Sequence, residues 1–306
     1  MRTPRRTRPA LPRADKPLTD YSIWTLAYCQ ADMPYDFFGG SGLMSNRGTV
    51  QIPMLYTVLV GGEVSGKKQV ALVDAGFGNQ EWMSRYQFFA WEDPQTVLAK
   101  VNLKPEDVDA ILVTHLHFDH IGNFGAFPNA HLYIQLDEYV GWLRTLALPA
   151  DFGGGERTWI LSSLDPQDIH NVATAISRGK VTLIEGDTEI LPGITAHLAK
   201  DSHTFGTQWF EVRTLNGAFA IAGDAVYWYA NVEKMWPPGY NQGNPFNLLF
   251  TYERIRRTLG NELERLIPGP DPQVWHRHRT WTVGPNEVAE ITLAKGQRSH
   301  KRVHAK

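Results

Sequence analysis

Residues 114–123, Thr-His-Leu-His-Phe-Asp-His-Ile-Gly-Asn, place three imidazoles and a carboxylate within six positions. They follow an apolar run at 108–113 that is typical of a buried strand. Side chains alternate faces in extended backbone, so His115 and His117 point the same way, as two ligands of one metal ion require. Asp119 and His120 follow where the strand gives way to a turn. Four candidate ligands at a strand end favour a metal site over surface or hydrogen-bonded core histidines.

The kind of metal follows from the donor atoms. Neutral imidazoles and a carboxylate suit zinc best, with manganese, iron or cobalt as alternatives. Cys29 is the only cysteine of the chain, which excludes an internal disulfide and a thiolate-rich metal site. We therefore predict one or two zinc ions held by histidine and aspartate.

The spacing His-x-His-x-Asp-His at residues 115–120 resembles the signature of the metallo-β-lactamase superfamily. The chain is most similar to its N-acyl homoserine lactonase-type branch, and the resemblance extends over about residues 56–279. It implies an α+β fold: a four-layer αβ/βα sandwich of two facing sheets with helices outside and metals at the sheet edge. Periodicity alone indicates only an α/β or α+β protein.

The resemblance extends to further motifs. An aspartate after a strand, here Asp74, would brace the metal loop. Residues 201–207 resemble the third motif and would make His203 the third imidazole on the first metal, while Asp224 would bridge two metals as in the fourth motif. On the residues alone, His203 is one of eleven histidines, and His197 in the preceding strand is its rival.

The fifth motif departs from the superfamily. Similar hydrolases carry Pro-Gly-His-Asp-Pro, whose histidine completes the second metal site, but residues 267–272 read Ile-Pro-Gly-Pro-Asp-Pro, and Pro270 offers no ligand. His276 and His278 are candidate substitutes. The other ligands of a second ion would be Asp119, His120 and Asp224. We expect one tightly bound ion and partial occupancy of a second site.

The expected reaction is hydrolysis. Zinc lowers the pKa of bound water from 15.7 toward about 7, which makes a nucleophile at neutral pH. Asp119 is placed to carry a proton to the leaving group. Tyr227 stands three residues after Asp224, and the resemblance implies that it contacts a lactone oxygen; the alternative is a core aromatic beside Trp228 and Tyr229. We predict a lactonase that opens a cyclic ester.

Three other functions remain open. The first is hydrolysis of another electrophile in a mononuclear site, such as an amide, a carbamate or an aromatic chloride, with Trp24, Trp228 and Trp236 as walls. The second, nucleic-acid or phosphodiester processing, requires a basic groove that a net charge of −2 does not indicate. The third is a non-catalytic metal-binding relative.

Length and composition set the domain organisation. The chain has 306 residues, 42% hydrophobic and 20% charged, which suffices for one large core. We expect a flexible basic arm at 1–20, one hydrolase domain at 21–294 and a basic polar tail at 295–306. No apolar run approaches a membrane span or an export signal. We expect a cytoplasmic protein with a small-molecule substrate, without nucleic-acid or membrane partners, and with a homodimer as an alternative to a monomer.

Local patterns predict the remaining elements. Residues 15–49 are rich in aromatics without a clean period, which favours core packing or the mouth of a site; a turn is expected at 39–42. Glycine loops are expected at 152–155, as a cover of the site, and at 231–244. Proline after a capping residue starts helices at Pro94, Pro166 and Pro245, and a short helix is expected around 139–146. The predicted strands are 54–60, 69–74, 131–135, 182–184, 194–197, 208–214 and 218–222.

Overall fold

A computed structural model describes residues 19–39, 47–152 and 159–300. The basic arm at 1–18, the turn at 40–42, the glycines at 153–155 and the end of the tail lie outside these ranges. Nothing in the structure bears on those predictions.

The first sheet contains nine strands in the order β13-β14-β1-β2-β3-β5-β6-β7, with β4 paired to β1. Neighbours are antiparallel from β13 to β3 and parallel from β3 to β7. The strands are β1 (Tyr21–Pro34), β2 (Thr49–Val64), β3 (Lys67–Val73), β4 (Phe88–Phe89), β5 (Ala110–Leu112), β6 (His131–Gln135), β7 (Val181–Ile184), β13 (Arg279–Val283) and β14 (Asn286–Thr292).

The second sheet contains five strands in the order β12-β11-β10-β9-β8. All neighbours are antiparallel except β11 and β12. The strands are β8 (Thr188–Leu191), β9 (Ile194–Leu198), β10 (Gln208–Thr214), β11 (Gly217–Gly223) and β12 (Leu266–Pro268).

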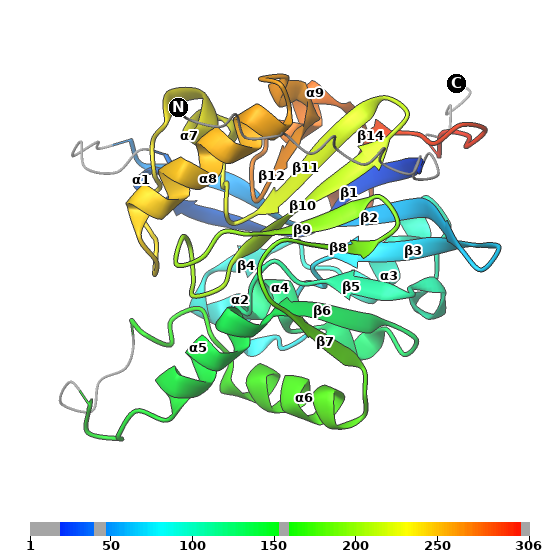
Figure 1. Cartoon of the computed structure of the whole chain (residues 1–306). Helices are drawn as coiled ribbons and strands as arrows, with labels where there is room; N and C mark the ends of the chain where they lie inside the picture. The colour runs from blue at the N-terminus through cyan, green and yellow to red at the C-terminus, as the bar shows by residue number, and fades with distance from the viewer. Residues whose placement is uncertain (1–18, 40–46, 153–158, 301–306) are drawn as a thin grey trace, which may run out of the picture.

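Helices connect the strands and cover the two outer faces of the sheets (Figure 1). Two of the predicted caps form their hydrogen bonds: the Asp165 and Asn244 side chains each accept from the backbone two residues on, at 2.9 Å. The helices are α1 (Tyr35–Phe38), α2 (Glu81–Arg85), α3 (Pro94–Val97), α4 (Phe118–Ile121), α5 (Leu136–Leu146), α6 (Pro166–Ser177), α7 (Tyr229–Lys234), α8 (Pro245–Thr258) and α9 (Val274–Arg277).

Three hydrophobic clusters separate the layers. One lies between the sheets and joins side chains such as Leu59 and Leu112 of the first to Phe210 and Ile221 of the second. A second covers the other face of the first sheet, where α5 and α6 lie beside β6 and β7. The third packs α7 and α8 against the outer face of the second sheet. This arrangement confirms the predicted four-layer sandwich.

The core packing expected for the aromatic segment is confirmed, but its strand was not predicted. Residues 21–38 form β1 and α1, and β1 is buried along residues 21–31. The strand lies between β14 and β2 with both faces covered, so its sequence lacks the alternation of a half-buried strand. Likewise, the expected loop at 231–244 begins inside α7.

The strand ends determine where the chemistry lies. The carboxyl ends of β3 and β5 lead into Asp74 and residues 113–120, and those of β11 and β12 lead into Asp224 and Pro270. Both sheets therefore deliver polar groups to one edge of the sandwich. Among the helices that the structure describes, none has the length and apolarity needed to cross a membrane.

Candidate metal centre

His115 and His117 lie in the loop after β5. This strand ends at Leu112 and is shorter than the strand predicted from the apolar run at 108–113. Their side chains still converge: Nε2 of His115 lies 2.9 Å from Nδ1 of His117. Both side chains are buried. The loop thus brings two imidazoles together, as predicted, through different ring nitrogens.

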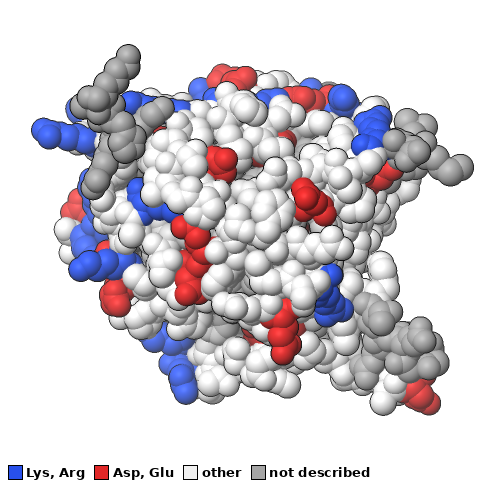
Figure 2. Space-filling model, turned by 180° about the vertical axis from the view of Figure 1, so that it is seen from behind, with Lys and Arg blue, Asp and Glu red and all other residues white. Residues whose placement is uncertain are grey.

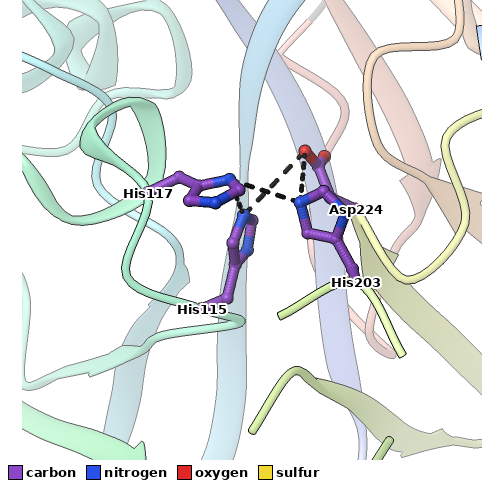
Figure 3. A group of neighbouring side chains, drawn as sticks. All are labelled: His115, His117, His203 and Asp224. Carbon is purple, nitrogen blue, oxygen red and sulfur yellow. Dashed lines mark hydrogen bonds and ion pairs between the residues drawn. The ribbon is translucent and has the colours of Figure 1, made fainter. Parts of the chain in front are cut away.

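His203 and Asp224 join this pair from the second sheet (Figure 3). Nε2 of His203 lies 3.2 Å from Nδ1 of His117 and 3.6 Å from Oδ2 of Asp224. The same Asp224 oxygen lies 3.9 Å from Nε2 of His115. All four ligand atoms lie within 4.8 Å of one another. We call His115, His117, His203 and Asp224 the histidine cluster.

The spacing of these atoms fits a bound cation. Tetrahedral ligands at 2.0–2.1 Å from zinc are separated by about 3.3 Å, and the four distances given above range from 2.9 to 3.9 Å. Oδ1 of Asp224 is buried and has no hydrogen-bond partner among the described residues. Buried polar atoms rarely remain unpaired. The histidine cluster could therefore hold a divalent cation.

The protonation of the imidazoles agrees with this reading. Burial, with the neighbouring histidines, holds the pKa of His115 and of His203 well below the usual range. Burial also lowers the pKa of His117, to about 4. The imidazoles are therefore neutral at pH 7, which is the form that binds metal ions.

A second group of ligand atoms adjoins the cluster. Nε2 of His120 lies 3.5 Å from Oδ2 of Asp119 and 3.5 Å from Oδ2 of Asp224. We call these three residues the Asp119 corner. Burial raises the pKa of Asp119. Burial alone would lower the pKa of His120, but the surrounding carboxylates raise it well above its usual value.

Asp74 orients His120 from behind. Its Oδ2 lies 2.8 Å from Nδ1 of His120, and its Oδ1 accepts a 2.8 Å hydrogen bond from the backbone N–H of Thr114. The Thr114 hydroxyl also contacts Asp74 and lies 3.0 Å from Nδ1 of His115. A hydrogen bond to the outer nitrogen fixes which nitrogen faces a metal. Asp74 thus braces the loop, as the sequence resemblance implied.

Glu138, which sequence reasoning missed, joins the two histidine loops. Its buried carboxylate accepts from the backbone N–H of Leu116 at 2.9 Å and from that of Gly206 at 2.7 Å. It also accepts from the Thr204 hydroxyl and from Nε1 of Trp142. A Cβ at Gly206 would lie 2.3 Å from the Glu138 nitrogen, which explains the glycine. A carboxylate at the start of a helix gives no sequence signal of this role.

The rival histidines lie elsewhere. His197 stacks on Trp209 and places Nε2 3.1 Å from Glu211. His278 lies 3.4 Å from the Tyr229 hydroxyl. Neither of these, nor His276, belongs to the group of candidate ligands found in the described part of the chain. Neither His276 nor His278 lines the pockets that contain Asp119, His120 and Pro270.

A pocket opens onto both groups of ligands. Its lining includes His117, Asp119, Asp224 and Pro270, together with three methionine and isoleucine side chains. We call it the aromatic pocket because most of the remaining lining is aromatic: Phe37, Phe38, Tyr86, Phe88, Phe118, Tyr227 and Tyr240. Of the predicted tryptophan walls, Trp24 and Trp228 are buried in the core and Trp236 is exposed, and none of them lines this pocket.

Lactonases are among the sequence relatives. A sequence model described as the metallo-beta-lactamase superfamily matches residues 56–271. An N-acyl homoserine lactonase of Bacillus cereus is 33% identical over 144 residues, which cover 46% of this chain and 48% of that protein. The N-acyl homoserine lactonase AiiA of Bacillus thuringiensis subsp. kurstaki is 26% identical over 176 residues, covering 57% and 60%. The chain thus spans about half to three fifths of the length of these relatives.

Solved structures share the fold. A quorum-quenching N-acyl homoserine lactone lactonase matches with a TM-score of 0.61 at 22% identity, over 84% of this chain and 95% of that one. AidC, described as a dizinc quorum-quenching lactonase in complex with a product, matches with a TM-score of 0.61 at 15% identity, over 92% and 99%. These likenesses agree with the four-layer architecture.

Proposed function

Because this chain belongs to the metallo-beta-lactamase superfamily, we propose that it is a metal-dependent hydrolase that opens a cyclic ester of the acyl homoserine lactone type. The observation that carries the proposal is the convergence of three neutral imidazoles and a buried carboxylate beside the aromatic pocket, which His117 and Asp224 line. The lactonases among the sequence relatives support the choice of a lactone.

The histidine cluster is proposed to hold one tightly bound ion, zinc being preferred and manganese, iron or cobalt the alternatives. A bound zinc ion supplies activated water and a Lewis acid. The Asp119 corner is proposed to hold a second ion only weakly. It offers Asp119, His120 and Asp224. Pro270 lines the pocket beside them but has no side-chain ligand atom, whereas the superfamily motif has a histidine at this position.

Two side chains of the pocket are proposed to act on the substrate. Tyr227 lines the aromatic pocket, and its ring lies 5.4 Å from that of His203. Burial and nearby carboxylates raise its pKa, so the phenol stays neutral and donates a hydrogen bond to the carbonyl oxygen of a lactone. Asp119 lines the same pocket and is placed to carry a proton to the ring oxygen that leaves.

The lining of the pocket favours an uncharged substrate. Of the described residues that line it, only Asp119 and Asp224 are acidic, and neither lysine nor arginine is among them. The one histidine of the lining, His117, is neutral at pH 7. A phosphate or carboxylate substrate would lack a cationic partner there. The face in Figure 2 carries scattered acidic and basic groups among uncharged atoms and no continuous basic groove, which argues against nucleic acid on that face.

An aromatic substrate is the alternative that a specific observation favours. The Phe37 and Tyr240 rings stack at 4.6 Å with an angle of 8° between their planes, and both line the pocket. Flat rings stack favourably on such a surface. Hydrolysis of an activated aromatic compound, including hydrolytic dehalogenation, would use the same ligand residues.

The deciding experiment is a substrate panel on metal-loaded protein. It should include acyl homoserine lactones of several chain lengths, simple aromatic lactones, aryl esters and activated aryl chlorides. We expect lactones to be opened fastest. Turnover of the aryl chlorides alone would favour the alternative, and no turnover of any compound by fully loaded protein would favour a non-catalytic relative.

A further inference from the structure

Gln242, in the loop between α7 and α8, contacts the metal centre and the pocket rim at once. Its Oε1 lies 2.8 Å from Nε2 of His117. Its Nε2 lies 3.1 Å from the carbonyl oxygen of Trp159 and 3.2 Å from that of Ile160. One side chain therefore joins a residue of the histidine cluster to the segment 159–163.

These contacts settle the orientation of the amide. Backbone carbonyl oxygens only accept hydrogen bonds, so the group that faces the Trp159 and Ile160 oxygens must be the amide nitrogen of Gln242. The amide oxygen then faces His117 and can only accept. His117 must therefore donate from Nε2.

The orientation of the amide fixes the tautomer of His117. A neutral imidazole carries one N–H, so a proton on Nε2 leaves the lone pair on Nδ1. Nδ1 is the atom that lies 2.9 Å from Nε2 of His115 and 3.2 Å from Nε2 of His203. The contact with Gln242 thus aims the lone pair of His117 at the centre of the cluster.

The same segment is tied to the pocket wall. The Tyr240 hydroxyl lies 2.8 Å from Oγ of Ser162 and 3.0 Å from Oγ of Ser163. The carbonyl oxygen of Ser163 accepts a 2.9 Å hydrogen bond from the backbone N–H of Phe118, the residue after His117. Ser163, Phe118 and Tyr240 all line the aromatic pocket. A closed path of contacts therefore runs from His117 through Gln242 and residues 159–163 back to Phe118.

We infer that Gln242 is a positioning residue that selects the metal-binding tautomer of His117 and couples the histidine cluster to the wall of the aromatic pocket. The inference rests on the proposed function, because it requires the histidine cluster to bind an ion. It assigns Gln242 no direct contact with the substrate. It also explains how the position of segment 159–163 affects a metal ligand.

Two substitutions separate the two parts of this role. Gln242→Glu keeps an oxygen acceptor for His117 but loses both donors to the backbone carbonyls. Gln242→Leu loses the acceptor and the donors. Gln167→Leu, on the outer surface of α6, is a matched control that changes the same side chain away from the site. Circular dichroism of each variant confirms folding.

The measurements are cobalt affinity by competition with a chelator, the visible absorption spectrum of the cobalt-loaded protein, and amide hydrogen exchange of residues 159–163. For Gln242→Leu we expect affinity to fall about 10- to 100-fold with an altered spectrum. For Gln242→Glu we expect at least native affinity. Both variants should exchange faster at 159–163, and the control should match the native protein.

Two results would overturn the inference in different ways. Native cobalt affinity and an unchanged spectrum in Gln242→Leu, with tight binding by the native protein, would remove Gln242 from its role and leave the proposed function intact. A native protein that binds no cobalt ion would contradict the proposed function itself and the inference with it.

Discussion

The histidine cluster gathers three imidazole nitrogens and a carboxylate oxygen within 4.8 Å, whereas the Asp119 corner gathers one imidazole nitrogen and two carboxylate oxygens and faces Pro270. The two groups share Asp224. The cluster has the full ligand set of a tetrahedral site, while the corner lacks the ligand that a histidine at position 270 would supply. We infer that the residue at position 270 makes the Asp119 corner a weaker metal site than the histidine cluster.

The supports of the two groups differ as well. Behind the cluster, Glu138 joins the loops of His115 and His203, and Gln242 contacts His117. Behind the corner, Asp74 holds the outer nitrogen of His120. Both groups are therefore preorganised, so the missing ligand, not poor orientation, should limit the corner.

The largest expected effect comes from removing a ligand of the cluster. His117→Ala should abolish the tightly bound ion and lower hydrolysis by about a thousandfold or more, since a metal ion supplies several kcal/mol of catalysis. Metal analysis and turnover on the same sample provide the check. His120→Ala, in the corner, is the matched comparison and should retain the tightly bound ion; equal metal loss in both variants would erase the distinction between the two groups.

Tyr227→Phe should lower turnover of a lactone by roughly ten- to a thousandfold if the hydroxyl stabilises the oxyanion. Metal content should not change, because the raised pKa of Tyr227 keeps the phenol neutral. Tyr229→Phe is the control, since the Tyr229 hydroxyl lies near His278 and outside the pocket lining. Unchanged kinetics in Tyr227→Phe would return Tyr227 to the core.

Pro270→His tests the corner directly. The new imidazole would supply the ligand that the sequence lacks, so the second ion should bind about tenfold or more tightly, a gain of about 1.4 kcal/mol or more. Calorimetric titration of metal-free protein with zinc measures the change. No gain in the affinity for a second ion would mean that the corner is limited by something other than position 270.

Glu138→Gln tests the support of the cluster. The amide keeps the shape of the carboxyl group, but its N–H groups would face at least one of the four groups that now donate hydrogen bonds to Glu138. This mismatch should lower the free energy of unfolding by about 2–3 kcal/mol. Urea unfolding of metal-free protein gives the value. Asp137→Asn, the exposed neighbour that pairs with Lys200, is the control and should change stability by less. Equal losses of stability in the two variants would show that Glu138 does not brace the cluster.

The last prediction concerns Asp168, whose carboxylate adjoins Gly122 beyond the corner. Burial, with nearby Asp165, raises its pKa to about 7. The unfolded carboxyl ionises near pH 4, so folding loses stability as pH rises from about 4 to about 7. Asp168→Asn should therefore match the native protein in stability near pH 4 and exceed it above pH 7, by up to about 4 kcal/mol. Thermal unfolding across this range would contradict the account if the difference did not grow with pH.

The sequence predicts the fold and part of the site for identifiable reasons. The spacing at 115–120 identifies the fold, while apolar runs and caps locate strands such as β5 and β10 and the helices α3, α5, α6 and α8. The strands β1, β8, β13 and β14 were not predicted; β1 is covered on both faces and therefore lacks a period of two. Proline after Asp165 and Asn244 located α6 and α8 because both caps are local interactions.

The supports of the site could not be predicted because they join distant segments. Glu138 contacts residues 116 and 206, and Gln242 contacts residues 117, 159 and 160. No local pattern marks either residue. Pro270, in contrast, was visible in the sequence because it interrupts an otherwise matching motif.

The most direct test of the account is the number of metal ions per chain, measured by elemental analysis on protein purified without chelator and dialysed extensively, with lactone opening assayed on the same sample. The account predicts about one retained ion, lactone turnover, and a second ion bound only at excess metal. Two ions retained with equal affinity, or full loading without hydrolysis, would contradict it.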